Sequence, residues 1–193
     1  MNRSDLPNII SIFRIFLVAP VMWLILEREF TAALIMFLVA GVSDGLDGYL
    51  AKRYGWTSRL GTILDPVADK LLLMGSYLML WWIDMLPLWL VVAIILRDVV
   101  IVCGAFAYHV LIGHYEMAPT LVSKVNTGAQ IILVLAVLSD VLLPIGSTVL
   151  TILVYVVLVT TIVSGIDYVW TWGVKAFHAR SRVRQTQNQK YRP

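Results

Sequence analysis

Charged residues are scarce in this chain of 193 residues, since 14% of them are charged and 60% are hydrophobic. Soluble domains carry about 25% charged and about 45–50% apolar residues, so an ordinary soluble domain is excluded and a polytopic membrane protein is indicated. The single cysteine, Cys103, excludes an intrachain disulfide. A cleavable signal peptide is not apparent in the start, MNRSDLPNII. Linkers, repeats and low-complexity segments are also missing, so we expect one transmembrane domain over residues 1–178 and a basic tail over residues 179–193.

Six apolar segments are long enough to cross a bilayer, which takes about 20 helical residues. They cover residues 8–27, 31–53, 61–83, 88–112, 124–143 and 147–174. The expected fold class is therefore all-α, with six transmembrane helices. Lysine and arginine gather before the first span, after the second, before the fifth and after the sixth, which places both termini in the cytoplasm. The net charge of +3 lies on one membrane face, so nucleic acid is not an expected partner.

Four aspartates interrupt the second and third spans. Asp44 and Asp47 lie in VSDGLDGYLAKR, and Asp65 and Asp69 lie in GTILDPVADKLL. A carboxylate at membrane depth costs roughly 2.5–3.5 kcal/mol, so each needs a partner. Hard oxygen ligands favour a divalent cation such as Mg²⁺. Residues three and four apart share a helical face, and a short loop makes the two helices antiparallel neighbours, so both pairs are expected to meet near the cytoplasmic surface.

The surroundings of the aspartates suit a bulky anionic ligand. Gly48 and Ala51 keep the helix face small, and Lys52, Arg53 and Arg59 supply positive charge beside it. Two carboxylate-bridged metals are a known device for phosphoryl transfer, and a neighbouring carboxylate can accept a proton from an attacking hydroxyl. A single intramembrane aspartate pair also occurs in hydrogen-bonding and transport sites. Four aspartates with interleaved glycines and a basic loop favour a catalytic centre.

The spacing of these residues resembles that of a known family. The segment DGLDGYLAK is followed after eight residues by GTILDPVAD, which is similar to the signature D-x2-D-G-x2-A-R-x8-G-x3-D-x3-D of the CDP-alcohol phosphatidyltransferases. Every spacing matches, and one position departs, because Lys52 stands where the family has arginine. Lysine keeps the charge but loses the bidentate fork. Pro7, Asn8, Ser11 and Arg14 at the start also resemble the family.

The resemblance implies a reaction and a set of site residues. An alcohol hydroxyl would attack the β-phosphorus of CDP-diacylglycerol, and CMP would leave. Two Mg²⁺ or Mn²⁺ ions are the implied cofactors, and Asp69 is the implied general base. The resemblance also implies a homodimer in the bacterial inner membrane, with an active site that faces the cytoplasm. The implied metal ligands are Asp44, Asp47, Asp65 and Asp69. The implied CDP-diacylglycerol contacts are Asn8, Asp44, Gly48, Ala51, Lys52 and Ser58.

The acceptor remains open between two members of the resembled family. Arg14, Arg97 and Lys124 are the other cations near the spans and are the expected acceptor contacts. The runs ILRDVV and PTLVSKVNT resemble the CMP-forming cardiolipin synthases, whose acceptor is phosphatidylglycerol. The enzymes that use glycerol-3-phosphate tend to have Arg-Glu and Gly-Lys-x-Lys-Thr at these places, where this chain has Asp98, Ser123 and Asn126. Phosphatidylglycerol is therefore the favoured acceptor, and glycerol-3-phosphate is the alternative.

Two classes outside the family also place carboxylates in membrane helices. Membrane prenyltransferases bind Mg²⁺-diphosphate with aspartate motifs, but those motifs lie far apart in sequence. Cation transporters typically show inverted repeats or broken helices, and the sequence has no sign of either. Release of CMP on addition of CDP-diacylglycerol and an alcohol distinguishes the three classes.

Overall fold

The computed structural model describes the backbone of residues 6–54, 59–112 and 120–190, and the side chains of residues 12–45, 67–104 and 120–171. Over these ranges the chain forms six helices and no strand, which confirms the all-α class. The helices are α1 (Leu6–Leu26), α2 (Phe30–Tyr54), α3 (Arg59–Trp82), α4 (Leu88–Ile112), α5 (Leu121–Ser139) and α6 (Ser147–Lys190). Each overlaps one of the six segments expected from the hydrophobic pattern.

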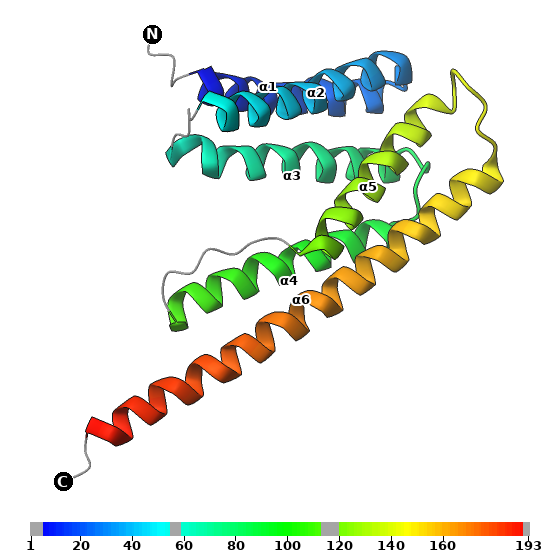
Figure 1. The fold of residues 1–193 in the computed structure, drawn as a ribbon. Coiled ribbons are helices and arrows are strands. Elements are labelled where there is room, and N and C mark those ends of the chain that lie inside the picture. The colour runs from blue at the N-terminus through cyan, green and yellow to red at the C-terminus, as the bar shows by residue number, and fades with distance from the viewer. Residues whose placement is uncertain (1–5, 55–58, 113–119, 191–193) are drawn as a thin grey trace. The chain divides into compact units, whose positions relative to one another are not determined.

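The chain divides into two compact units. The first comprises Met1–Val91 and Gln130–Ile152, and so holds α1, α2, α3 and the second half of α5. In it, α1 packs against both α2 and α3 (Figure 1). On α2, the small residues Ala33 and Ala40 are fully buried at a spacing of seven, which places them on one helical face. On α3, Gly75 gives similar room, since a Cβ there would lie 2.8 Å from Sδ of Met22.

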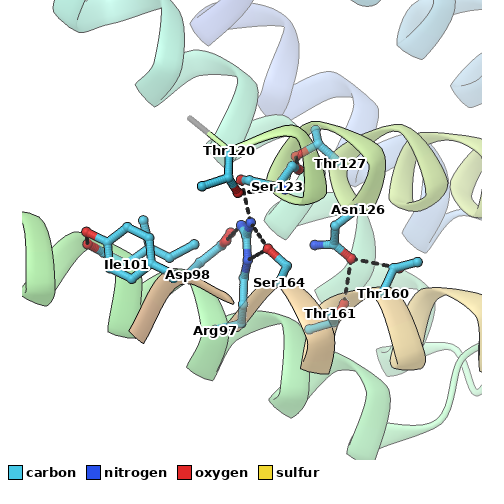
Figure 2. Close-up of polar contacts among 11 residues, drawn as sticks. Arg97, Asp98, Ile101, Thr120, Ser123, Asn126, Thr127, Thr160, Thr161 and Ser164 are labelled. Carbon is cyan, nitrogen blue, oxygen red and sulfur yellow. Dashed lines mark hydrogen bonds and ion pairs between the residues drawn. The ribbon is translucent and has the colours of Figure 1, made fainter. Parts of the chain in front are cut away.

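The second unit comprises Val92–Ala129 and Leu153–Pro193. It therefore contains most of α4, the first half of α5 and nearly all of α6. Polar side chains join the three helices, as Figure 2 shows for the residues around Arg97. Tyr168 of α6 also donates a hydrogen bond of 2.9 Å to the carbonyl of Ile101 on α4.

Two short connections end their helices in the same way. Arg28 and Asp84 have φ of 62° and 64°, the left-handed region that non-glycine residues seldom adopt. The amide of Arg28 donates to the carbonyl of Ile25, and that of Glu29 donates to Leu24. Asp84 and the residue after it repeat this pair of bonds at the end of α3. Both connections are Schellman motifs, which satisfy carbonyls that the helix end would otherwise leave without partners.

The outer surfaces of the helices are apolar. Phe16, Trp23, Val42, Leu121 and Trp170 each expose more than 60% of their surface. Among the described residues, two helices are long and apolar enough to cross a membrane, Leu121–Ser139 and Ser147–Thr171, and Ile12–Leu26 and Phe30–Gly45 are shorter apolar helices. Exposed apolar surface on this scale is uncommon in soluble monomers. The six-span arrangement and the cytoplasmic termini stay predictions.

Candidate active site

Arg14 joins the two halves of the aspartate motif. Its Nη1 lies 2.6 Å from Oδ1 of Asp44 on α2 and 2.6 Å from Oδ1 of Asp69 on α3. The two carboxylate oxygens are therefore separated by no more than twice that distance. Three helices thus converge on one atom of a guanidinium, and the expectation that the second and third spans bring their aspartates together is met for Asp44 and Asp69.

Burial differs sharply between the arginine and its partners. The Arg14 side chain is 1% exposed, whereas those of Asp44 and Asp69 are 41% and 44% exposed. A buried guanidinium needs compensating charge, and these carboxylates supply it. Two donors, Nε and Nη2 of Arg14, are buried without a hydrogen-bond partner. One cation is thus shared by two carboxylates that are themselves partly exposed.

This donor set fits part of a divalent-metal centre. Carboxylate oxygens are the ligands that Mg²⁺ and Mn²⁺ prefer, and those of Asp44 and Asp69 are accessible. Asp47 lies on α2 three residues after Asp44, and Asp65 lies on α3 four residues before Asp69, so each pair shares a helical face. The side chains of Asp47 and Asp65 lie outside the described residues. Within the described part of the chain no cluster of three or more candidate ligands occurs.

Several expected substrate contacts also lie beyond what the structure describes. Ser58 falls in an undescribed segment, and Asn8, Gly48, Ala51 and Lys52 are placed as helix backbone only. Their roles stay predictions. Arg14, an expected acceptor contact, is found against Asp44 and Asp69, and its contact with the acceptor stays a prediction. Lys124 is exposed on α5.

Arg97, the third expected acceptor contact, lies at the centre of a buried polar cluster in the second unit (Figure 2). Its Nη1 donates to Oδ1 of Asp98 at 2.7 Å, and its Nη2 donates to Oγ of Ser123 and of Ser164, each at 2.6 Å. Nε donates to Ser164 as well, at 3.2 Å. The side chains of Arg97 and Asp98 are 4% and 7% exposed, so the pair is buried and its charges compensate each other.

Asn126 extends this cluster between α5 and α6. Its Oδ1 accepts hydrogen bonds of 2.9 Å from the hydroxyls of Thr160 and Thr161. Asn126 is fully buried, and its Nδ2 has no hydrogen-bond partner. Sequence reasoning missed Thr160, Thr161 and Ser164. The signal was a run of hydroxyl side chains at a spacing of three to four along an otherwise apolar helix.

Comparisons with known proteins match most of the chain. The family model for CDP-alcohol phosphatidyltransferase covers residues 4–173. The rat protein named cardiolipin synthase (CMP-forming) is 38% identical over 154 residues, which cover 72% of this chain and 51% of that protein. The Bacillus subtilis protein named CDP-diacylglycerol–glycerol-3-phosphate 3-phosphatidyltransferase is 35% identical over 147 residues, which cover 71% of this chain and 75% of that protein. The chain spans about half the length of the cardiolipin synthases that it matches.

Proposed function

Because this chain belongs to the CDP-alcohol phosphatidyltransferase family, we propose that it transfers the phosphatidyl group of CDP-diacylglycerol to an alcohol. The observation that carries the proposal is the meeting of Asp44 and Asp69 at Nη1 of Arg14. These two aspartates come from opposite ends of the aspartate motif and from different helices, yet they share one cation and remain accessible. Such an arrangement favours a reaction centre over isolated structural pairs.

In the proposed reaction the acceptor hydroxyl forms a bond to the β-phosphorus, the bond from that phosphorus to the CMP oxygen breaks, and the hydroxyl proton passes to Asp69. Divalent ions, when bound by Asp44, Asp47, Asp65 and Asp69, supply charge stabilisation for the diphosphate and the leaving oxygen. Arg14 holds Oδ1 of Asp69 beside Oδ1 of Asp44. It therefore positions the base and a ligand together. The proposed contacts to the CDP moiety are Asn8, Gly48, Ala51, Lys52 and Ser58.

Phosphatidylglycerol is the acceptor that we propose, which makes the product cardiolipin. The support is the state of Arg97, whose charge is compensated by Asp98 and whose nitrogens already donate to Ser123 and Ser164. An arginine in this state is poorly suited to bind a dianionic phosphate, which needs donors that are free to form a bidentate contact. The phosphodiester of phosphatidylglycerol carries one negative charge and so needs fewer free donors than a dianionic phosphate.

Glycerol-3-phosphate is the second candidate acceptor. The Bacillus subtilis relative, whose name specifies that acceptor, is nearly as similar to this chain as the rat cardiolipin synthase. Identity alone therefore does not separate the two acceptors.

The proposed setting is a membrane, with six spanning helices, cytoplasmic termini and an active site that faces the cytoplasm. Support comes from the exposed apolar residues on the described helices. Both substrates would then keep their acyl chains in the bilayer while their headgroups reach Asp44 and Asp69. We also propose a homodimer, which follows from the family resemblance alone.

The test uses purified protein in mixed micelles with CDP-diacylglycerol and either phosphatidylglycerol or glycerol-3-phosphate. We expect CMP release with cardiolipin as product, arrest by a chelator, and recovery with Mg²⁺ or Mn²⁺. Phosphatidylglycerophosphate as the sole product would show that the acceptor is glycerol-3-phosphate, while the proposed phosphatidyl transfer would still hold. No CMP with any alcohol would overturn the transfer itself.

A further inference from the structure

Arg14 and the divalent ions of the proposed reaction use the same two carboxylates. Nη1 of Arg14 lies 2.6 Å from Oδ1 of Asp44 and 2.6 Å from Oδ1 of Asp69. Both aspartates are among the proposed metal ligands, and all three residues belong to the first unit. The arginine therefore already compensates part of the negative charge that would attract a divalent ion.

The exposure of these side chains indicates that the two kinds of cation reach the carboxylates from different sides. The Arg14 side chain is 1% exposed, so it contacts Asp44 and Asp69 from the interior of the unit. The two aspartates are 41% and 44% exposed and are accessible from outside. A carboxylate has two oxygens and about four lone-pair sites. The guanidinium at Oδ1 therefore leaves acceptor sites at which an ion can bind.

Arg14 is also poorly able to move away when an ion binds. Among the described residues, Asp44 and Asp69 are the acidic partners of its guanidinium, and its Nε and Nη2 are buried without a hydrogen-bond partner. A buried charge that loses its partners is strongly destabilised. The guanidinium is therefore expected to stay at the carboxylates, where its charge repels any divalent ion that they hold.

We propose that Arg14 lowers the affinity of this site for divalent cations. The proposal rests on the proposed function, because it concerns the same metal centre. It adds to that function a residue that determines how tightly the ions are held. A carboxylate cluster without an internal cation would bind them more tightly.

The test measures Mn²⁺ binding without either substrate, so the result does not depend on activity. Electron paramagnetic resonance follows free Mn²⁺ while the purified protein is titrated in detergent. Arg14→Gln removes the charge, and Arg14→Lys keeps the charge but changes the side chain. Arg28→Gln is the matched control, because it removes an exposed charge from the turn after α1. That turn is about 20 Å away at 1.5 Å per helical residue, well beyond the Debye length of about 8 Å.

We expect Arg14→Gln to bind Mn²⁺ about tenfold more tightly than the original protein, a modest factor because solvent screens charges at partly exposed groups. The Kd values of Arg14→Lys and Arg28→Gln should stay within about threefold of the original value, since the charge at the site is kept in both. An unchanged or weaker affinity in Arg14→Gln would overturn the proposal. An equal gain in Arg14→Lys would also overturn it, because the effect would then come from the shape of arginine and not from its charge.

If Arg14→Gln does not fold without metal, the same titration still decides the question. An ion that binds only the folded state stabilises it, so the folded fraction is followed by circular dichroism as Mn²⁺ is added. Recovery of the folded protein below the Kd of the original protein supports the proposal. Recovery only above that concentration, or no recovery, contradicts it.

Failure of the proposed function has a different signature. If neither the original protein nor Arg14→Gln binds Mn²⁺, the metal centre is wrong and the proposal falls with it. If the original protein binds Mn²⁺ and Arg14→Gln does not bind it more tightly, the metal centre stands and only the proposed effect of Arg14 is wrong.

Discussion

Arg14 is a buried cation held by two accessible carboxylates on different helices. Removing its charge leaves Asp44 and Asp69 to repel each other. The same change releases the geometric link between the base and a metal ligand. Stability and catalysis are therefore expected to fall together at this position.

For Arg14→Gln we expect a loss of about 1–3 kcal/mol in unfolding free energy, the scale of hydrogen bonds to charged groups, reduced where the partners are exposed. We expect kcat to fall about a hundredfold, because Asp69 loses its fixed position. Denaturant titration in detergent and CMP release measure the two effects. Arg28→Gln, in the turn between α1 and α2, is the control and should change neither. An unaltered kcat in Arg14→Gln would contradict the positioning role.

For Asp69→Asn we expect transfer to slow by about 10²–10⁴-fold, the usual contribution of a general base. Binding of CDP-diacylglycerol should persist, since Asp44, Asp47 and Asp65 remain. A fluorescent donor analogue measures binding, and product formation measures transfer. Asp84→Asn, an exposed aspartate in the turn after α3, serves as the control. Loss of binding in parallel with transfer would assign Asp69 to substrate binding instead.

The approach of Asp44 to Asp69 was predictable from sequence, whereas the cation between them was not. Spacing along a helix determines which side chains share a face, so the pairing of Asp44 with Asp47 and of Asp65 with Asp69 follows from the motif. Arg14 lies 55 positions before Asp69, and no local pattern indicates which of several cations reaches it. The same holds for Ser164, which contacts Arg97 across 67 positions. Both contacts depend on how α1 and α6 pack, which is a tertiary property.

The hydrophobic pattern predicted the number of helices and their positions in the sequence well. It predicted the residues at which the helices begin and end less well. The fifth helix begins at Leu121, three residues before the expected span, because the hydroxyl of Thr120 accepts from the amide of Ser123 and caps it. It ends at Ser139 instead of residue 143, since Asp140 accepts from the amides of Ile145 and Gly146 and shapes a turn. The sixth helix continues past residue 174 to Lys190, where hydropathy alone has no signal.

The Schellman motifs after α1 and α3 provide a test at this scale. Arg28→Gly and Asp84→Gly should each raise the unfolding free energy by about 0.5–1 kcal/mol, because glycine relieves the cost of a left-handed conformation. Part of that gain is lost to the greater freedom of glycine in the unfolded chain. Glu27→Gly, one residue before the first of these positions, should destabilise. Thermal unfolding in one detergent compares the three, and destabilisation by all three would be inconsistent with the two positive φ values.

For the molecule as a whole, the distribution of lysine and arginine predicts an orientation. In a Cys103→Ala background, cysteines placed at Ser4, Ser58 and Thr186 should resist an impermeant thiol reagent added to intact cells. A cysteine at Ser147, at the start of α6, should react with it. Disruption of the cells should make all four reactive. Labelling at Ser58 from outside would reverse the orientation and with it the side from which CDP-diacylglycerol is used.

The length of α6 has a mechanical consequence. From Ser164, in the buried polar cluster, the helix continues to Lys190, a rise of about 39 Å at 1.5 Å per residue. That exceeds the roughly 30 Å thickness of a bilayer's hydrocarbon layer. The C-terminal part of an upright α6 would therefore extend beyond the hydrocarbon layer as a helix. The basic positions between 175 and 190 would then belong to a rigid helix and not to a flexible chain. Their distance from the lipid surface would be determined by the tilt of α6. A movement of its C-terminal end would be transmitted along the helix to Ser164.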